Sequence, residues 1–452
     1  MNLKNAKMKK VILKRLIVSN WRSITFDVTL NDDVTTISGR NGIGKSTLFH
    51  AWSWLLTSYT DVENPKNTNL FDSTKELSEH TPEASVTAYI TINGYSFVLK
   101  KTAKPCFVRD RESGEYVKSN TDTYKMFIDS VNVTATEFNA WLNANLCDTS
   151  MLMYCVDGSF FADLSINDRQ KARKLLTDMV GELLDSDFHN DYKFLKDVAG
   201  NRSIEDFKKL RKTHIKNLEK EKQNLSVLIE TYEKDLVDNK TAIEEKKKEI
   251  AKLELECLNL AKETTTSFEV CPTCGQAIKN SVNVEENVNK QLEISGKIKL
   301  KYKELGSLEK ITAEEIDSMR AKQRAMSNEI SSCYRDVFMC DSYLNESADI
   351  ITAKINSKLN GYSIDMWSKQ KNGERVADCV IVNGRGVPYS TLNGSDRIKA
   401  CIAIQQMFCS HCGVVMPTFV DEASVFDSKN KPVLDSQTFF LMASDSNYLT
   451  ID

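Results

Sequence analysis

The sequence predicts an α/β head that is split by a long antiparallel coiled coil, and three observations support this fold class. A phosphate-loop pattern follows an expected strand early in the 452-residue chain, and an apolar strand that ends in two carboxylates lies late in it. Between them runs a proline-poor stretch with heptad spacing and a Cys-x-x-Cys motif in its middle. The chain is therefore expected to run out along one helical arm and return along another.

The composition fits this organisation and limits the possible classes of protein. The chain has only 7 prolines and 17 glycines, and 27% of its residues are charged, as expected for long exposed helices. Its net charge of −3 restricts any DNA-binding surface to a local patch. The first residues lack a signal-peptide pattern, and no run reaches the length of a membrane span. We therefore expect a cytoplasmic protein with reduced thiols and no membrane association.

Residues 1–200 are expected to form the N-terminal half of the head. Apolar and β-branched runs predict strands, and Asn93-Gly94 between two such runs predicts a hairpin. The polar, Asn- and Asp-rich stretch 58–83 is expected to be an irregular surface insertion. The expected strands cover residues 11–18, 34–38, 85–92 and 95–101, and the expected helices cover residues 47–57, 138–146 and 168–184.

Residues 203–269 and 279–349 are expected to form the ascending and descending arms. Their apolar residues step by three and four positions, which predicts an a/d seam. A long helix packed on a globular body is the alternative, but such a helix needs a wider apolar stripe. A kink or break in the descending arm is predicted near Gly296 and at Gly306–Thr312, because glycine disfavours a continuous helix. The seam residues are Leu225, Ile229, Tyr232, Leu236, Ile243, Ile250, Leu253, Cys257, Leu260, Met326, Ile330, Cys333, Val337, Cys340 and Leu344.

The segment between the second expected strand, 34–38, and the first expected helix fits the phosphate-loop pattern. Its glycines would let backbone N–H groups surround a phosphate at a helix N-terminus, which favours anions. Lys45 is expected to reach the β- and γ-phosphates of ATP, and the Ser46 hydroxyl to ligate Mg²⁺. The ATP-binding residues expected here are Gly39, Arg40, Asn41, Gly42, Ile43, Gly44, Lys45, Ser46 and Thr47.

Residues 350–452 are expected to complete the head, with an apolar strand at 414–420 that ends in paired carboxylates. Asp421 would hold Mg²⁺ through water, and Glu422 would polarise the attacking water as the catalytic residue beside Lys45. An apolar strand that ends in Asp-Glu is not rare by itself. Its place after the coiled coil supports the assignment.

Two Cys-x-x-Cys motifs have different expected roles. Cys271 and Cys274 lie in the turn 270–278 between the arms and supply two of the four thiolates of a structural zinc site. A second copy of the chain would supply the other two, although idle surface thiols or a redox pair are alternatives. Cys409 and Cys412 end an apolar helix and are expected to belong to the core rather than to a metal site.

In this order of motifs the chain resembles the SbcC-type zinc-hook ATPases of DNA double-strand-break repair. These are relatives of the structural-maintenance-of-chromosomes proteins with heads of the ATP-binding-cassette type. The resemblance covers the whole chain in architecture but is close only at the phosphate loop, the hook and the Asp-Glu region. The compact size is similar to that of versions carried by phages and mobile elements.

The resemblance implies roles for further residues. In that family two heads sandwich two ATP molecules, and a signature loop completes each site in trans. Here that loop would contain Asn393, Gly394 and Ser395, in place of the usual Ser-Gly-Gly. Asp427 would be the D-loop residue at the dimer interface. Arg22 would lie near the nucleotide, although a surface arginine in a turn fits equally well.

Two further elements of the family pattern are altered or hard to locate. The Q-loop has no clear glutamine, and its expected place is Tyr154–Gly158. The position of the switch histidine offers only Ser444 or Asp445. Nucleotide binding is therefore expected, while the rate of turnover stays open.

The resemblance implies an ATPase that dimerises through its heads and its hook, grips double-stranded DNA and regulates a separate SbcD-type nuclease. A slow ATP-gated DNA clamp or sensor without a nuclease is the alternative, favoured by the altered signature loop. A scaffold with a dead nucleotide site is opposed by the intact phosphate loop and carboxylates. The basic residues that could contact DNA phosphates, or form only a solvated face, are Lys9, Lys10, Lys14 and Arg15.

Overall fold

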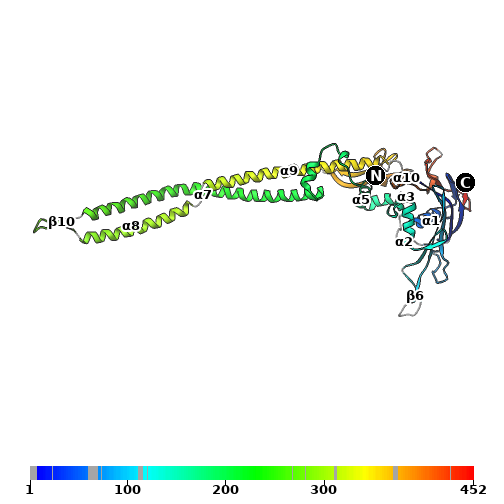
Figure 1. Cartoon of the computed structure of the whole chain (residues 1–452), viewed down its shortest axis with the longest axis horizontal. Coiled ribbons are helices and arrows are strands. Elements are labelled where there is room, and N and C mark those ends of the chain that lie inside the picture. The colour runs from blue at the N-terminus through cyan, green and yellow to red at the C-terminus, as the bar shows by residue number, and fades with distance from the viewer. Residues whose placement is uncertain are drawn as a thin grey trace. The chain divides into compact units, whose positions relative to one another are not determined.

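The computed structural model divides the chain into two compact units. We call them the head, Met1–His189 with Asn345–Asp452, and the arm, Asn190–Leu344. Figure 1 shows the long helices of the arm and the mixed strands and helices of the head. The first segment of the head ends 11 residues before the expected limit at 200, and its second segment begins 5 residues before the expected limit at 350. The structure describes residues 8–22, 24–59, 70–72, 74–109, 116–119, 121–266, 268–279, 281–309, 313–369, 375–427 and 429–452.

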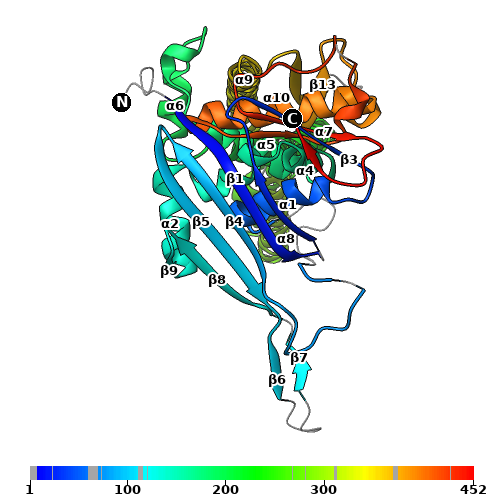
Figure 2. The ribbon, with the colours of Figure 1, turned by 90° about the vertical axis from the view of Figure 1, so that its right-hand side faces the viewer.

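A largely antiparallel sheet forms one layer of the head, with strand order β14-β1-β4-β5-β8-β9 and with β2 paired to β1. In Figure 2 the strands β1, β4, β5 and β8 lie side by side as one broad surface. The expected Asn93-Gly94 hairpin is confirmed, because Ile92 pairs with Tyr95. The strands are β1 (Lys9–Trp21), β2 (Ile24–Thr29), β4 (Ala84–Ile92), β5 (Tyr95–Lys104), β8 (Thr123–Ile128), β9 (Val131–Val133) and β14 (Val414–Val415).

A second sheet of the head carries the strand that enters the phosphate loop. Its order is β15-β16-β3-β17, with β15, β16 and β3 parallel and β17 antiparallel to β3. Every strand neighbour of β3 therefore comes from the C-terminal half of the head. The strands are β3 (Val34–Gly39), β15 (Thr418–Val420), β16 (Thr438–Ala443) and β17 (Thr450–Ile451).

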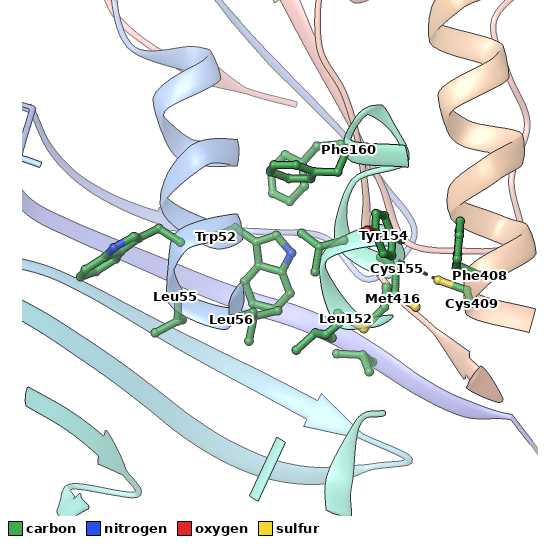
Figure 3. Packing of buried hydrophobic residues seen from close by; sticks show 14 of the residues in the cluster. Trp52, Leu55, Leu56, Leu152, Tyr154, Cys155, Phe160, Phe408, Cys409 and Met416 are labelled. Atoms are coloured by element: carbon green, nitrogen blue, oxygen red, sulfur yellow. Dashed lines mark hydrogen bonds between the residues drawn. The ribbon is translucent and has the colours of Figure 1, made fainter. Parts of the chain in front are cut away.

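One hydrophobic core joins helices from both halves of the head. Trp52 of α1, Tyr154 of α3 and Phe408 of α10 all belong to it, and Figure 3 shows their side chains turned toward a common interior. Tyr154 and Phe408 stack with ring centroids 4.8 Å apart. The head helices are α1 (Lys45–Thr57), α2 (Ala135–Asn145), α3 (Thr149–Val156), α4 (Ser159–Asn167), α5 (Arg169–Val180) and α10 (Gly394–Cys412).

The expected single strand at 414–420 is wrong, because the chain divides there into β14 and β15, which belong to different sheets. Pro417 lies between them and has no N–H to donate to a ladder. Its carbonyl instead accepts a bond of 3.3 Å from Nε2 of buried Gln405, which also donates to the carbonyls of Cys155 and Val156. A buried side chain on α10 thus fixes the crossing from one sheet to the other.

The two sheets are also tied together by buried Gln437. Its amide donates to the carbonyls of Leu13 and Asn31 at 2.8 and 2.7 Å and accepts from the Leu13 N–H at 2.8 Å. Each of these groups would be costly to bury without a partner.

Three smaller pairs of elements complete the head: strands β6 (Phe107–Arg109) and β7 (Tyr116–Lys118), strands β12 (Tyr362–Lys369) and β13 (Arg375–Asn383), and the short 3₁₀ turns 389–391 and 423–425.

The arm consists of paired helices that return through a short hairpin. The apolar seam agrees with the expectation, since Ile229, Ile250 and Ile330 are buried in otherwise exposed helices. Gly296 does not interrupt the descending helix, so the kink expected there is wrong. The elements are α6 (Lys193–Ala199), α7 (Ile204–Thr266), β10 (Phe268–Val270), β11 (Ala277–Lys279), α8 (Ser281–Leu308) and α9 (Ala313–Asn356).

The expected break at Gly306–Thr312 agrees with the end of α8 at Leu308 and the start of α9 at Ala313. Residues 310–312 of that segment lie outside the described part of the chain, as do residues 60–69 and 73 of the expected insertion at 58–83. No helix among the described residues is both long and apolar enough to cross a lipid bilayer.

Candidate nucleotide-binding site

The expected phosphate loop connects β3 to α1, and its backbone needs glycine at two positions. Gly42 and Gly44 have φ angles of 84° and 101°, in the region that other residues rarely adopt. Gly44 is the N-cap of α1, and a Cβ atom there would lie 2.5 Å from the Ile24 side chain. The loop therefore turns tightly at the N-terminus of a 13-residue helix, where backbone N–H groups favour an anion.

Lys45 lies folded along the loop. Its Nζ donates hydrogen bonds of 2.8 and 2.9 Å to the carbonyls of Gly39 and Arg40. Arg40 in turn donates from Nη1 to the Asn447 side chain at 2.6 Å, and its N–H bonds the Ser446 carbonyl at 3.0 Å. The loop is thus held against the segment between β16 and β17, and Lys45 is positioned beside it.

A cavity of about 490 Å³ lies over the loop and brings the two predicted motifs together. Lys45 and Ser46 of the N-terminal half of the head line this cavity together with Asp421 and Glu422 of the C-terminal half. The carboxylates reach this place because β15 lies next to β16, which pairs with β3. The full lining is Asn41, Gly42, Gly44, Lys45, Ser46, Thr47, Asp421, Glu422, Ser424, Val425, Leu441 and Ala443.

The backbone at Glu422 has an unusual conformation. Its φ angle is 50°, which costs a residue with a Cβ atom about 1 kcal/mol. The Glu422 N–H donates to the Asp421 carboxylate at 2.9 Å, and the Ser424 hydroxyl accepts from the Ala443 N–H at 2.8 Å. These bonds hold the turn that presents both carboxylates to the cavity.

Ser444 occupies the expected place of the switch histidine. Its Oγ atom is buried and has no hydrogen-bond partner within the described residues. A buried hydroxyl without a partner is uncommon in folded proteins. Ser444 directly follows Ala443, which lines the cavity, so Ser444 is the next residue in sequence after the nucleotide-site lining.

Asp157 is a further candidate residue of the nucleotide site. The sequence patterns identify it only as part of the expected Q-loop segment Tyr154–Gly158. A second cavity, of about 250 Å³, is lined by Asp157 and shares Asp421 with the first. The Asp157 carboxylate accepts bonds of 2.8 and 2.6 Å from the N–H and hydroxyl of Ser159. Burial raises the pKa of Asp157, the two bonds from Ser159 lower it, and the Asp421 carboxylate in the same cavity raises it.

Gly158 allows the turn that carries Asp157 to approach α10. A Cβ atom at this position would lie 1.9 Å from the Cys401 carbonyl oxygen, closer than any real contact. Only glycine therefore fits between the end of α3 and the side of α10 without a backbone shift.

The residues of the first cavity fit ATP and Mg²⁺. Oxygen donors from Ser46 and Asp421 are the ligands that Mg²⁺ prefers, and the glycine-rich turn leaves N–H groups available for phosphate oxygens. When bound there, Mg²⁺ would neutralise charge on the phosphates.

Within the expected phosphate loop, Gly39, Arg40 and Ile43 do not line the cavity, and four expected residues outside the loop do not line it either. Arg22 does not line the cavity; its Nη1 lies 3.2 Å from Nδ1 of His50, and its guanidinium lies over the Trp21 ring. Asn393 and Gly394 are exposed at the start of α10, where the Asn393 side chain accepts the Asp396 N–H at 2.9 Å. Ser395 donates its hydroxyl to that same Asn393 oxygen at 2.9 Å.

Asp427 closes its own turn. Its carboxylate accepts the N–H groups of Lys429 and Asn430 at 2.8 and 2.9 Å and the Asn430 amide at 2.6 Å. These bonds lower the pKa of Asp427, and the bond from the Asn430 side chain contributes most. The residue is exposed and anionic, but its bonds also explain it as a local turn residue.

The basic residues near the start of β1 are mostly paired. Lys14 and Arg15 form ion pairs of 2.5 Å with Asp32 and Asp27. Lys9 donates to backbone carbonyls at 2.9 and 3.3 Å. These contacts favour the solvated-face interpretation, because paired charges add little attraction for DNA phosphates.

The expected hook turn 270–278 lies within the β10–β11 hairpin of the arm. The Cys271 N–H donates to the Gln276 carbonyl and the Gly275 N–H to the Cys271 carbonyl, both at 2.9 Å. Backbone N–H groups of Thr273 and Cys274 lower the pKa of Cys271 by bonding its sulfur. Within the described residues, no third side chain joins Cys271 and Cys274 in a metal-ligand set.

Comparison with known proteins places the chain within one family. Residues 15–265, more than half of the chain, match the family described as "AAA domain". No curated protein matches the chain.

Several solved structures are similar to the chain at low identity. One is an Smc head domain with a coiled coil and joint from Pyrococcus yayanosii, with 11% identity, TM-score 0.38 and coverage of 98% of this chain and 97% of that one. Another is an Smc head domain with an extended coiled coil, bound to the C-terminal domain of ScpA, from Pyrococcus furiosus, with 12% identity, TM-score 0.38 and coverage of 96% and 90%. The recombination mediator RecF bound to ATP has 12% identity, TM-score 0.38 and coverage of 100% and 96%.

Proposed function

Because the chain belongs to the AAA domain family of ATPases, we propose that its head binds ATP with Mg²⁺ and hydrolyses it to control a grip on double-stranded DNA. One observation carries the nucleotide part of this proposal. Lys45 and Ser46 share a cavity with Asp421 and Glu422, although the two motifs are separated by most of the chain.

Each residue of the cavity has a distinct task in this proposal. The loop N–H groups and Lys45 bind the phosphates, and Ser46 and Asp421 hold Mg²⁺. Glu422 accepts a proton from the attacking water, or orients it, from a turn that already presents its carboxylate to the cavity. Asp157 adds a third carboxylate next to Asp421, in place of the glutamine expected in a Q-loop.

A homodimer of heads would complete the site. Asn393 and Gly394 are exposed and Ser395 is half-buried at the N-terminus of the 19-residue helix α10, and none of the three lines the cavity of its own chain. A helix N-terminus attracts phosphate, so this loop suits the γ-phosphate of ATP bound to a partner head. Exposed Asp427 would contact the partner at the same interface.

The DNA-related part of the proposal has two versions. In the first, the chain is an SbcC-type ATPase that regulates a separate SbcD-type nuclease. In the second, it is a slow ATP-gated clamp or sensor without a nuclease. Ser444 favours the second version, because a serine hydroxyl in place of a histidine cannot take up a proton near neutral pH.

The hook is proposed to join two chains through zinc. Cys271 and Cys274 lie on a tight hairpin whose N–H groups favour thiolate at Cys271, and thiolate is the form that binds metal. Two such hairpins would provide a tetrahedral set of four sulfurs. About one zinc ion per two chains is therefore expected at this place.

Steady-state ATP turnover with and without linear double-stranded DNA tests the function, with Glu422→Gln as the blank. DNA-stimulated turnover supports the first version, and ATP binding without turnover supports the second. A chain that binds no ATP would contradict both.

Head dimerisation is tested separately in a chain that carries Cys271→Ser and Cys274→Ser, so that the hook does not contribute. Adding Glu422→Gln should trap an ATP-bound dimer, seen as a doubling of mass in light scattering. Adding Asn393→Ala as well should prevent it, while Asn383→Ala outside the signature loop should not. A monomer with ATP in the Glu422→Gln chain would contradict the sandwich arrangement.

A further inference from the structure

Four cysteines from distant parts of the sequence meet in the head. The sulfur atoms of Cys147, Cys155 and Cys412 all lie within 4.8 Å of one another. Cys409 lies three residues before Cys412 on α10, and its sulfur is 3.4 Å from the Cys155 carbonyl oxygen. Figure 3 shows Cys155 and Cys409 turned toward each other across the core. We call these residues the thiol cluster.

From this convergence we infer that the thiol cluster binds a single thiophilic divalent metal ion of the zinc class inside the head. This site is separate from the hook and does not depend on the proposed function. It revises the expectation that Cys409 and Cys412 belong only to the core.

The spacing of the sulfurs fits one ion. Zinc–thiolate bonds of about 2.3 Å in a tetrahedron place neighbouring sulfurs about 3.8 Å apart. Three thiol side chains already approach that spacing, and all are free of disulfide bonds. Cys409 and Cys412 lie on the same side of α10, because positions three apart are neighbours on a helix surface. A small rotation of the Cys409 side chain would bring in the fourth sulfur.

The surroundings of the thiol cluster suit a cation held by thiolates. Cys412 is the last residue of α10, and the carbonyl groups at a helix C-terminus favour positive charge. Lys9 donates from Nζ to the carbonyl of Leu146, so a positive charge is held beside the segment that carries Cys147. Cys147, Cys155 and Cys409 are at most 7% exposed, which keeps water from competing for the metal.

The metal would connect the two halves of the split head. Cys147 and Cys155 belong to the half before the arm, whereas Cys409 and Cys412 belong to the half after it. Cys155 and Cys409 are 254 residues apart in sequence. An ion held by both pairs would fix α3, with the residue shortly before it, to the end of α10, and so stabilise the folded state against separation of the halves.

The test measures zinc in the full-length chain with the hook removed by Cys271→Ser and Cys274→Ser. Metal content is read by inductively coupled plasma mass spectrometry after purification under reducing conditions and passage over a chelating resin. This chain should retain about one zinc ion per chain. Adding Cys412→Ser should reduce the content to near zero. Cys401→Ser, a half-buried cysteine on the same helix, should leave the content unchanged.

A second measurement covers the case in which Cys412→Ser fails to fold. The hookless chain is depleted of metal and titrated with Co²⁺, whose thiolate charge-transfer and visible d–d bands report tetrahedral sulfur ligands. Strong bands that saturate at one equivalent support the site. Absence of both zinc and cobalt signals, or a disulfide within the thiol cluster in freshly reduced protein, would overturn it.

The hook substitutions alone should remove about one zinc ion per two chains, and only a loss of that size concerns the hook rather than this site. Because the nucleotide cavity contains none of the four cysteines, ATP binding is measured in parallel. A chain that binds ATP but no metal would contradict this inference and leave the proposed nucleotide site intact.

Discussion

The head and the arm are each stabilised internally by a different kind of contact. Every buried polar side chain among the described residues lies in the head, including Lys101, Gln405 and Gln437. In the arm the helices meet along an apolar seam flanked by partly exposed ion pairs, such as Arg211 with Asp336 at 3.0 Å and Lys301 with Glu249 at 2.8 Å. The head thus depends on single positions such as Gln405 and Gln437, whose buried amides have partners, and the arm depends on a repeated local pattern.

This difference indicates where a substitution should lower stability or binding strongly. A buried polar group that loses its partner costs about 1–3 kcal/mol, whereas an exposed ion pair contributes about 0–1 kcal/mol. Damage to the head should be severe and specific, and damage to the arm should be gradual. Each unit should also tolerate damage to the other.

The largest effect is expected at Lys45. Lys45→Ala should weaken ATP binding by more than about 100-fold, because the loop loses its only side-chain cation among the cavity-lining residues. Isothermal titration calorimetry measures the affinity, and Lys104→Ala at the exposed last residue of β5 serves as the control. Unchanged affinity would remove the phosphate-loop assignment. Circular dichroism should show the same helical content, because the arm is not involved.

Gly158 provides a test of close packing in the head. Gly158→Ala should lower the free energy of unfolding by about 2–3 kcal/mol, because the new methyl group would overlap the Cys401 carbonyl. Chemical denaturation monitored by tryptophan fluorescence measures it. Gly384→Ala, where a Cβ would lie 3.7 Å from its nearest neighbour, should change stability little. Equal effects of the two substitutions would show that the turn after Asp157 can move away from α10.

Ile330 tests the seam of the arm. Ile330→Ala removes a side chain that packs with Ile215, Leu218 and Cys333, and should cost about 1.5 kcal/mol. Val237→Ala at a position that is 67% exposed should cost less than about 0.5 kcal/mol. Hydrogen exchange of the arm helices measures both. If Ile330→Ala also weakened ATP binding, the separation between the two units would fail.

Lys101 gives an effect that is spread over a range of pH and is the smallest when taken per pH unit. Its Nζ donates to the Trp54 carbonyl and the Ser58 hydroxyl at the end of α1, and burial lowers its pKa from 10.5 to about 7. Between these values the unfolded chain holds a proton that the folded chain has released. The free energy of unfolding should therefore rise with pH in this window, by about 1 kcal/mol per pH unit.

Lys101→Met should remove this rise, whereas Lys104→Met on the same strand should keep it. Urea denaturation at pH 7, 8 and 9 measures the three chains. A wild-type stability that does not change over this range would mean that Lys101 keeps its proton when buried.

The sequence patterns predicted the long helices of the arm and the strand–loop–helix context of the phosphate-loop segment, because both depend on local rules. The seam spacing defines the helical pairing, and the turn chemistry of Asn93-Gly94 defines a hairpin. Lys45 and Glu422 each carry a recognisable pattern, and the parallel order β15-β16-β3 brings them to one cavity. That convergence required only the expectation that carboxyl ends of parallel strands meet at one edge.

The patterns failed where contacts between distant segments decide the structure. The short helices α3 and α4 were not predicted, because their residues are buried on several sides and show no amphipathic period. The division of 414–420 depends on Pro417 and on Gln405 from a neighbouring helix. The thiol cluster was missed because Cys147 and Cys155 have no metal-ligand spacing of their own. The place of Arg22 beside His50 likewise follows from tertiary packing.

The strand order of the second sheet has a consequence for synthesis of the chain on the ribosome. β3 leaves the exit tunnel early, but both strands that flank it, β16 and β17, are translated about 400 residues later. At ordinary translation speeds this delay lasts tens of seconds. During that time β3 has no native neighbour and presents two open edges, which are sites for aggregation or for a chaperone. A chain truncated before residue 438 should therefore be unable to bind ATP, so nucleotide binding reports that translation has passed β16.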